Sequence, residues 1–180
     1  MKQRAILFIG HGGIPKDYDY AKVKRLKELE RTRSRLRSPM SEEEKQIDAE
    51  IRHWPRTAEN DPFKAGFEDI VRALQSKRNE AIFTAYNEFC TPSIEEAIEK
   101  LAQDGIKEIV LLTSMFTRGG IHSDGEIPEI VEKLRPKFPH LRLNYAWPFD
   151  SDLVAQFLSK QIDNFSANCE STSEKYDFIS

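Results

Sequence analysis

This sequence is poor in the features that mark secreted and membrane-spanning proteins. Its 180 residues include two cysteines, Cys90 and Cys169, which lie far apart and form no CxxC pair. Such sparse cysteine favours a reduced, cytoplasmic protein over one held together by disulfides. No apolar run is long enough to cross a bilayer, and the first residues show no signal-peptide cleavage pattern. We therefore expect a cytoplasmic protein that does not enter a membrane.

Two catalytic motifs and a strong charge of either sign are missing as well. No GxxxxGK[ST] phosphate loop occurs, so we expect no nucleotide cofactor. No GxSxG elbow occurs, which argues against a hydrolase of that type. Against 27 Lys and Arg residues stand 30 Asp and Glu residues, which gives a net charge of -3. This balance argues against nucleic acid as the main partner.

Strand and helix patterns alternate along the chain. Apolar runs predict four strands, at residues 5–9, 81–86, 108–112 and 141–147. The first three runs are apolar on both faces, as in parallel strands that helices cover on both sides, and the fourth alternates more, as nearer an edge. The expected helix starts are Asp61-Pro62, Thr91-Pro92, the capping-box pair Ser123 and Glu126, and Asp150 or Ser151. This order predicts an α/β fold with an open, parallel four-stranded sheet and helices on both faces.

One connection is too long for an ordinary strand-to-helix loop, and it covers about residues 15–59. Its first half is densely basic, its second half is acidic, and Pro39 lies between them. Ser41 and Glu44 have capping-box spacing at the start of the acidic half. We therefore expect an inserted helical hairpin with one basic and one acidic arm. The expected organisation is a single domain over residues 1–163 with this insertion, followed by a polar tail over residues 164–180.

Three residues of types that commonly bind metal ions follow the first three predicted strands. His11 follows the first strand, Glu88 the second and His122 the third. Because the carboxyl ends of parallel strands meet at one edge of a sheet, these side chains can converge there. Two imidazoles and a carboxylate suit Co²⁺, Fe²⁺, Ni²⁺ or Zn²⁺ and leave positions open for a substrate. In the alternative interpretation, the histidines hydrogen-bond within their loops and Glu88 caps the following helix.

The sequence segments around these residues resemble those of the small sirohydrochlorin chelatase family. In that family a strand ends in His-Gly-Ser and a Glu precedes a proline-containing helix start. A Gly-x-His motif is then followed by Asp-Ile-Pro. The corresponding segments here, in the same order, are residues 6–13 (ILFIGHGG), 87–97 (NEFCTPSIEEA) and 119–128 (GGIHSDGEIP). Two positions depart from this pattern. Gly13 replaces the serine, and Glu126 replaces the aspartate before Ile-Pro, where we expect it to cap the helix. The hairpin has no counterpart in the pattern.

The resemblance implies a chelatase fold and the ATP-independent insertion of Co²⁺ or Fe²⁺, or else Ni²⁺, into sirohydrochlorin or a related tetrapyrrole, in cobalamin or siroheme synthesis. It implies that His11, Glu88 and His122 hold the metal, with His11 and His122 as the catalytic residues. It also implies a homodimer, because one α/β unit supplies one wall of a tetrapyrrole cleft. The expected substrate-binding residues are Gly12, Gly13, Met115, Phe116, Arg118, Gly119 and Gly120. The alternative function is a tetrapyrrole or metal carrier that does not turn over.

The cations of the hairpin have two interpretations. The implied substrate carries eight carboxylates, which a basic arm beside the cleft could attract. Alternatively, the basic and acidic arms pair with each other on solvated faces. The candidate carboxylate-binding residues are Lys22, Lys24, Arg25, Arg31 and Arg118.

Overall fold

The computed structural model describes residues 3–173 and shows an α/β fold with an inserted hairpin. The strands are β1 (Arg4–Gly10), β2 (Ala81–Tyr86), β3 (Glu108–Thr113) and β4 (Arg142–Tyr145). The helices are α1 (Tyr20–Leu36), α2 (Glu42–Arg52), α3 (Pro62–Gln75), α4 (Ile94–Gln103), α5 (Ile127–Leu134) and α6 (Ser151–Ser173). A π-helical turn, Ile121–Glu126, precedes α5, and a 3-10 turn, Arg135–Lys137, follows it. None of the helices in this part of the chain has the length and apolar character that crossing a bilayer requires.

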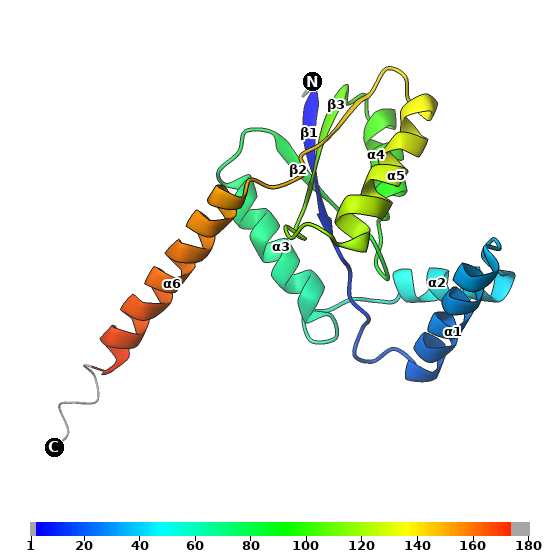
Figure 1. The fold of residues 1–180 in the computed structure, drawn as a ribbon, viewed down its shortest axis with the longest axis horizontal. Helices are drawn as coiled ribbons and strands as arrows, with labels where there is room; N and C mark the ends of the chain where they lie inside the picture. Colours follow the sequence, from blue (N-terminus) through cyan, green and yellow to red (C-terminus); the bar gives the residue numbers. More distant parts are fainter. Residues whose placement is uncertain (1–2, 174–180) are drawn as a thin grey trace.

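The four strands form one parallel sheet in the order β2-β1-β3-β4, so the predicted open parallel sheet is confirmed. Helix α3 lies on one side of this sheet, and α4 and α5 lie on the other (Figure 1). As its sequence pattern indicates, β4 is an edge strand, although it is shorter than the predicted run. Because β1 and β3 are neighbours at the centre, the loops that follow them emerge close together at one edge.

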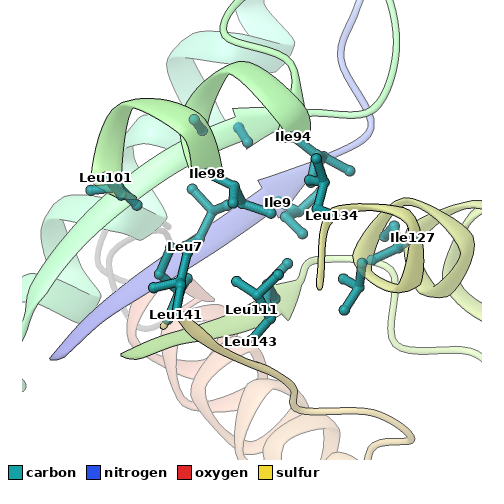
Figure 2. Packing of buried hydrophobic residues seen from close by; sticks show 14 residues of the cluster. Leu7, Ile9, Ile94, Ile98, Leu101, Leu111, Ile127, Leu134, Leu141 and Leu143 are labelled. Carbon is teal, nitrogen blue, oxygen red and sulfur yellow. The ribbon is translucent and has the colours of Figure 1, made fainter. Parts of the chain in front are cut away.

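Alternate residues of β1 serve two different hydrophobic clusters. Leu7 and Ile9 point toward α4 and α5, where they pack with Ile98 and Leu134 in the larger cluster (Figure 2). Phe8 points to the opposite side and packs against Phe67 of α3, with 4.8 Å between the ring centroids. The period of two in a strand thus explains how one short apolar run holds helices on both faces.

Two of the predicted helix starts are wrong. Helix α4 is capped by Ser93 rather than by Thr91-Pro92, and Ser93 and Glu96 form the complete capping box. Ser123 and Glu126 form no capping box, because Ser123 is buried inside the π-helical turn and neither side chain caps α5. The carboxylate of Glu126 has another partner, which is described below.

The inserted residues form the predicted helical hairpin, α1 and α2. Val23 and Leu26 of α1 pack against Ile47 and Ile51 of α2, and Phe89 closes this cluster from the side of the main domain. The two arms also pair through charge, as the second interpretation predicts. The ion pairs between them are Lys22–Glu50 at 2.6 Å, Arg25–Glu43 at 2.7 Å and Arg33–Glu44 at 2.7 Å.

Arg56, at the end of the insertion, makes several contacts that connect it to the sheet domain. The guanidinium of Arg56 donates to the carbonyl oxygens of Gly13 at 2.6 Å, Ile51 at 2.8 Å and Phe89. It also forms an ion pair of 2.5 Å with Asp61, in which both side chains are nearly inaccessible to solvent. The hairpin is therefore joined to the loops after β1 and β2.

Helix α6 projects away from the sheet (Figure 1). It continues to Ser173, past residue 164 where the sequence pattern predicts a polar tail, and residues 174–180 lie outside the described part of the chain. Large apolar side chains remain exposed along it, namely Leu153, Phe157, Leu158, Ile162 and Phe165. Burying such a side chain is worth roughly 1.5–3 kcal/mol, so this surface is suited to a partner.

Candidate metal centre

The structure brings the three predicted ligands together at the carboxyl edge of the sheet. His11, Glu88 and His122 each offer one ligand atom, and these atoms all lie within 4.8 Å of one another. The rings of His11 and His122 meet edge to face with 4.8 Å between their centroids. Nε2 of His122 lies 4.0 Å from Oε1 of Glu88. All three side chains are half-buried, so they are both fixed and accessible.

The loop that carries His11 is fixed against the loop that carries Glu88. The backbone N–H of Glu88 donates to the carbonyl oxygen of His11 at 2.8 Å. Between them Gly12 has a φ of +96°, and a β carbon there would lie 1.8 Å from the carbonyl oxygen of Glu88. Only glycine fits this approach. Nδ1 of His11 lies 2.8 Å from the carbonyl oxygen of Gly12, and a carbonyl only accepts, so Nδ1 carries the proton and Nε2 offers its lone pair.

His122 is oriented by a carboxylate one turn later in the chain. Its Nδ1 lies 2.7 Å from Oε2 of Glu126, and the side-chain amide of Asn87 donates to the same oxygen at 2.7 Å. Burial raises the pKa of the Glu126 carboxyl, but the hydrogen bonds from Asn87 and His122 outweigh it and hold the pKa below its usual value. An ionised carboxylate only accepts, so in this contact Nδ1 of His122 is the donor and Nε2 offers its lone pair, while the Asn87 amide nitrogen, 2.8 Å from the same Nδ1, gives its hydrogen to Glu126.

Glu88 belongs to the candidate metal centre and also contacts the insertion. The next residue, Phe89, has a φ of +56°, a left-handed conformation that is strained for an aromatic residue. Nζ of Lys27, from α1, lies 3.8 Å from Oε2 of Glu88 and 4.6 Å from the centroid of the Phe89 ring. The inserted hairpin therefore places a cation directly beside the proposed metal-binding carboxylate.

The expected substrate-binding residues divide into two groups. Met115, Phe116 and Gly120 line a surface pocket of about 310 Å³ together with His122, so these predicted residues do adjoin the metal centre. Arg118 and Gly119 are exposed in the same loop but do not line this pocket, and the Gly119 N–H donates to Asp124. The pocket is predominantly apolar, which suits the face of a flat organic ring.

Gly12 and Gly13 lie on the opposite loop and are closely packed. A β carbon at Gly13 would stand 3.2 Å from Oδ1 of Asp61 and 3.2 Å from Cβ of Phe63. These neighbours would have to shift before a serine could occupy the position. The departure from the family pattern at Gly13 therefore has a steric reason in this structure.

Three side chains that contact the candidate ligands were not predicted from the sequence. Asn87 was quoted only as part of a motif, Glu126 was expected to cap a helix, and Lys27 was not among the candidate substrate contacts. The spacing of His122 and Glu126 is i,i+4, which places two side chains on one helical face and could have identified the pair. Nothing in the sequence indicates that Lys27 contacts Glu88, because 60 residues of chain lie between them.

Comparison with known proteins was made for sequence and for structure. The sequence model of the CbiX family matches residues 58–164, a segment that contains Glu88 and His122 and excludes His11 and the hairpin. No curated protein matches the sequence. Among solved structures, a putative cobalamin (vitamin B12) biosynthesis CbiX protein from Marinobacter aquaeolei VT8 is similar, with 11% identity and a TM-score of 0.55. The match covers 93% of this chain and 98% of that one.

Two structures of SirB are also similar. The sirohydrochlorin chelatase SirB from Bacillus subtilis subspecies spizizenii, in complex with cobalt, has 17% identity and a TM-score of 0.50 over 89% of this chain and 50% of that one. SirB from Bacillus subtilis with Fe3+ has 17% identity and a TM-score of 0.49 over 85% of this chain and 44% of that one. The present chain thus spans about half the length of the SirB chains that it matches.

Proposed function

The chain belongs to the CbiX family of small sirohydrochlorin chelatases, and on that premise we propose that it inserts a divalent metal ion into sirohydrochlorin or a related tetrapyrrole without ATP. The observation that carries the proposal is the shared orientation of the two imidazoles. His11 and His122 each engage Nδ1 in a hydrogen bond, which leaves both Nε2 lone pairs free, and Nε2 of His122 lies 4.0 Å from Glu88. Such a hydrogen bond fixes the tautomer and the ring orientation of a metal-ligating histidine.

In the proposed reaction the metal ion is a substrate. Nε2 of His11, Nε2 of His122 and a carboxylate oxygen of Glu88 replace part of its water shell and hold it beside the ring. The apolar pocket at Met115 and Phe116 receives one face of the macrocycle. Positioning the ion against the ring nitrogens supplies most of the rate enhancement, because the encounter becomes intramolecular.

Insertion also requires two protons to leave the ring. Two pyrrole N–H bonds break as metal–nitrogen bonds form, and the metal separates from its protein ligands in the same process. The released Nε2 of His11 and the released carboxylate of Glu88 are then free bases next to the ring. We propose that they accept the two protons and pass them to solvent, since both side chains are half-buried rather than enclosed.

We propose Co²⁺ or Fe²⁺ as the metal, which makes the protein a cobaltochelatase or a ferrochelatase of cobalamin or siroheme synthesis. SirB in complex with cobalt supports Co²⁺. A site with two nitrogen ligands and one oxygen ligand also binds Ni²⁺ tightly, so metal supply contributes to the selection of the metal ion.

The proposed compartment is the cytoplasm, as the two widely separated cysteines predict.

We further propose that the protein acts as a homodimer. Two copies have about the length of one SirB chain, of which this chain covers 50%. The exposed apolar side chains of α6 supply a surface that a second copy would bury. The mass in solution tests this proposal. A dimer that becomes monomeric in Phe157→Glu/Ile162→Glu supports it, and a monomeric native protein contradicts it.

The chelatase is tested by anaerobic absorbance spectroscopy of sirohydrochlorin mixed with Co²⁺ or Fe²⁺. The native protein is compared with His11→Ala/His122→Ala, and His140→Ala, an exposed histidine of a surface turn, is the matched control. Accelerated metal insertion that the control retains and the double variant loses supports the proposal. A spectral shift on binding without turnover would instead identify a carrier.

A further inference from the structure

Helix α1 carries basic residues on two different faces. Lys22, Arg25 and Arg33 face α2, and their charges are neutralised by Glu50, Glu43 and Glu44. Lys24, Lys27 and Arg31 follow one another at spacings of three and four residues, so they share another face. This face forms a shallow groove that also includes Tyr20, Val23 and Glu28.

Two of the three cations on the second face lack a protein partner within the described residues. Lys24 and Arg31 are exposed, and neither makes an ion pair or a side-chain hydrogen bond with any residue of the described range 3–173. Lys27 lies between them and reaches both Glu30 at 3.0 Å and Glu88 at 3.8 Å. Glu28 lies one turn from both Lys24 and Arg31 in the same groove, but its carboxylate pairs with Arg25 at 3.8 Å and leaves these two cations without an ion pair.

These three residues, Lys24, Lys27 and Arg31, form a cationic strip. Its middle residue contacts the candidate metal centre. Lys27 contacts the Glu88 carboxylate directly and lies over the Phe89 ring, whose centroid is 6.4 Å from that of His11. At the rise of an α-helix, Lys24 and Arg31 are roughly 10 Å apart along the axis, one turn to either side of Lys27. The strip thus extends about one helical turn to either side of the point where α1 contacts Glu88.

The strip is also held firmly in place. Arg52 donates to the carbonyl oxygens of Cys90 at 3.2 Å and Asn87 at 3.4 Å, on either side of Glu88. Arg56 adds its contacts to the carbonyl oxygens of Gly13 and Phe89. These bonds connect the hairpin to the backbone that carries the proposed ligands, so the cations are preorganised relative to the metal centre.

We propose that Lys24, Lys27 and Arg31 form an anion-binding strip, supplied by the insertion, that binds the peripheral carboxylates of the macrocyclic substrate. The strip would select polycarboxylate tetrapyrroles over esterified or less acidic ones and would set the ring above the metal ligands. The inference rests on the proposed function for the identity of the ligand. The strip lies outside the segment that the CbiX family model matches, so it is a feature of the insertion.

The first measurement is the affinity for metal-free sirohydrochlorin, which requires no turnover. Lys24→Gln/Arg31→Gln is compared with Lys77→Gln/Lys137→Gln, which removes the same charge from two exposed positions away from the site. Loss of two exposed charge contacts is expected to raise the Kd about tenfold, and the control should retain the native Kd. The salt dependence of binding should also become weaker in the first variant. Equal Kd values for both variants would overturn the inference.

A second measurement separates this inference from the proposed function. In the insertion assay, Lys24→Gln/Arg31→Gln is expected to raise KM by the same factor, with the loss in KM rather than in kcat. The octamethyl ester of the macrocycle should bind the native protein and the variant equally. If sirohydrochlorin turns over but Kd and KM do not change, the strip is disproved and the chelatase stands. If sirohydrochlorin binds strip-dependently without turnover, the strip stands and the chelatase fails.

Discussion

Nδ1 of His122 lies 2.7 Å from a carboxylate oxygen of Glu126, which is one helical turn later in the same π-helical segment. Asn87 donates to that same oxygen, so the carboxylate is fixed from two sides. The contact decides which nitrogen of His122 carries the proton and therefore which nitrogen can bind a metal ion. A residue expected to cap a helix instead contacts His122, and we propose that it positions this imidazole for a metal ion.

Glu126→Gln is therefore expected to weaken Co²⁺ binding by about tenfold or more without removing a ligand atom. A neutral amide holds the imidazole less firmly and makes Nε2 a poorer donor. Titration of the protein alone with Co²⁺, followed by its visible absorbance, measures the effect. Glu129→Gln, an exposed acid on the next turn, should retain the native affinity. Equal affinities for the two variants would show that Glu126 has no positioning role.

Gly12→Ala should be among the most destabilising single substitutions in the chain. The φ of +96° and the approach of 1.8 Å to the Glu88 carbonyl oxygen cannot both be kept with a β carbon present. We expect a loss of about 3 kcal/mol in the free energy of unfolding, measured with urea. Gly66→Ala is the matched control, because a β carbon there meets nothing within 4 Å and helix α3 should gain about 1 kcal/mol. Similar losses in both variants would contradict the argument.

Lys27→Gln should have opposite effects on the two substrates. Its ammonium lies 3.8 Å from Glu88 and competes with a metal ion for that carboxylate. Because the pair is partly exposed, its removal is worth about 0.2–1 kcal/mol, so Co²⁺ should bind about two- to fivefold more tightly in the absence of the ring. Affinity for metal-free sirohydrochlorin should fall in the same variant. Calorimetric titrations with each ligand measure both, and weaker Co²⁺ binding would refute the competition.

Arg56→Met should destabilise the whole chain, because it leaves the carboxylate of Asp61 buried without its partner. Removing one member of such a pair costs about 3–5 kcal/mol. Arg72→Met removes an ion pair with Asp69 in which both side chains are largely exposed, and it should change the free energy of unfolding by less than about 1 kcal/mol. Thermal unfolding of both variants tests the contrast. A small effect at Arg56 would mean that the buried pair with Asp61 contributes little to stability.

The capping box of α4 predicts a pH dependence of stability. The Ser93 backbone N–H donates to the Glu96 carboxylate at 2.7 Å and, against a smaller effect of burial, holds the pKa of Glu96 below its usual 4.5. The folded state thus favours the ionised form, so this stabilisation is present above pH 4.5 and is lost as the pH falls further. Glu96→Gln should therefore show a shallower loss of stability below that pH than Glu99→Gln. Equal slopes would contradict the assignment.

The sequence predicts the sheet and the metal ligands because both depend on local signals. A buried parallel strand is a continuous apolar run, and the loop after it lies at the ligand-binding edge, so His11, Glu88 and His122 could be identified together. The partners of these ligands depend on a π-helical turn and on a contact between α1 and Glu88. The i,i+4 spacing of His122 and Glu126 is compatible with a cap as well as with a pair, so Glu126 was misassigned, and Lys27 has no sequence signal that links it to Glu88. The direction of α6 could not be predicted from the sequence either. An amphipathic pattern shows that one face of a helix is apolar but not which part of the structure covers that face.

The attachment of the hairpin through Arg56 has a consequence for how this chain can diversify. Three of its four contacts are to main-chain carbonyl oxygens, which every residue type supplies, and only Asp61 contributes a specific side chain. The surface of the hairpin can therefore change residue by residue while its junction with the metal centre stays intact. On the proposals made above, such changes would alter which macrocycle rims the insertion recognises and would leave the proposed metal ligands in place.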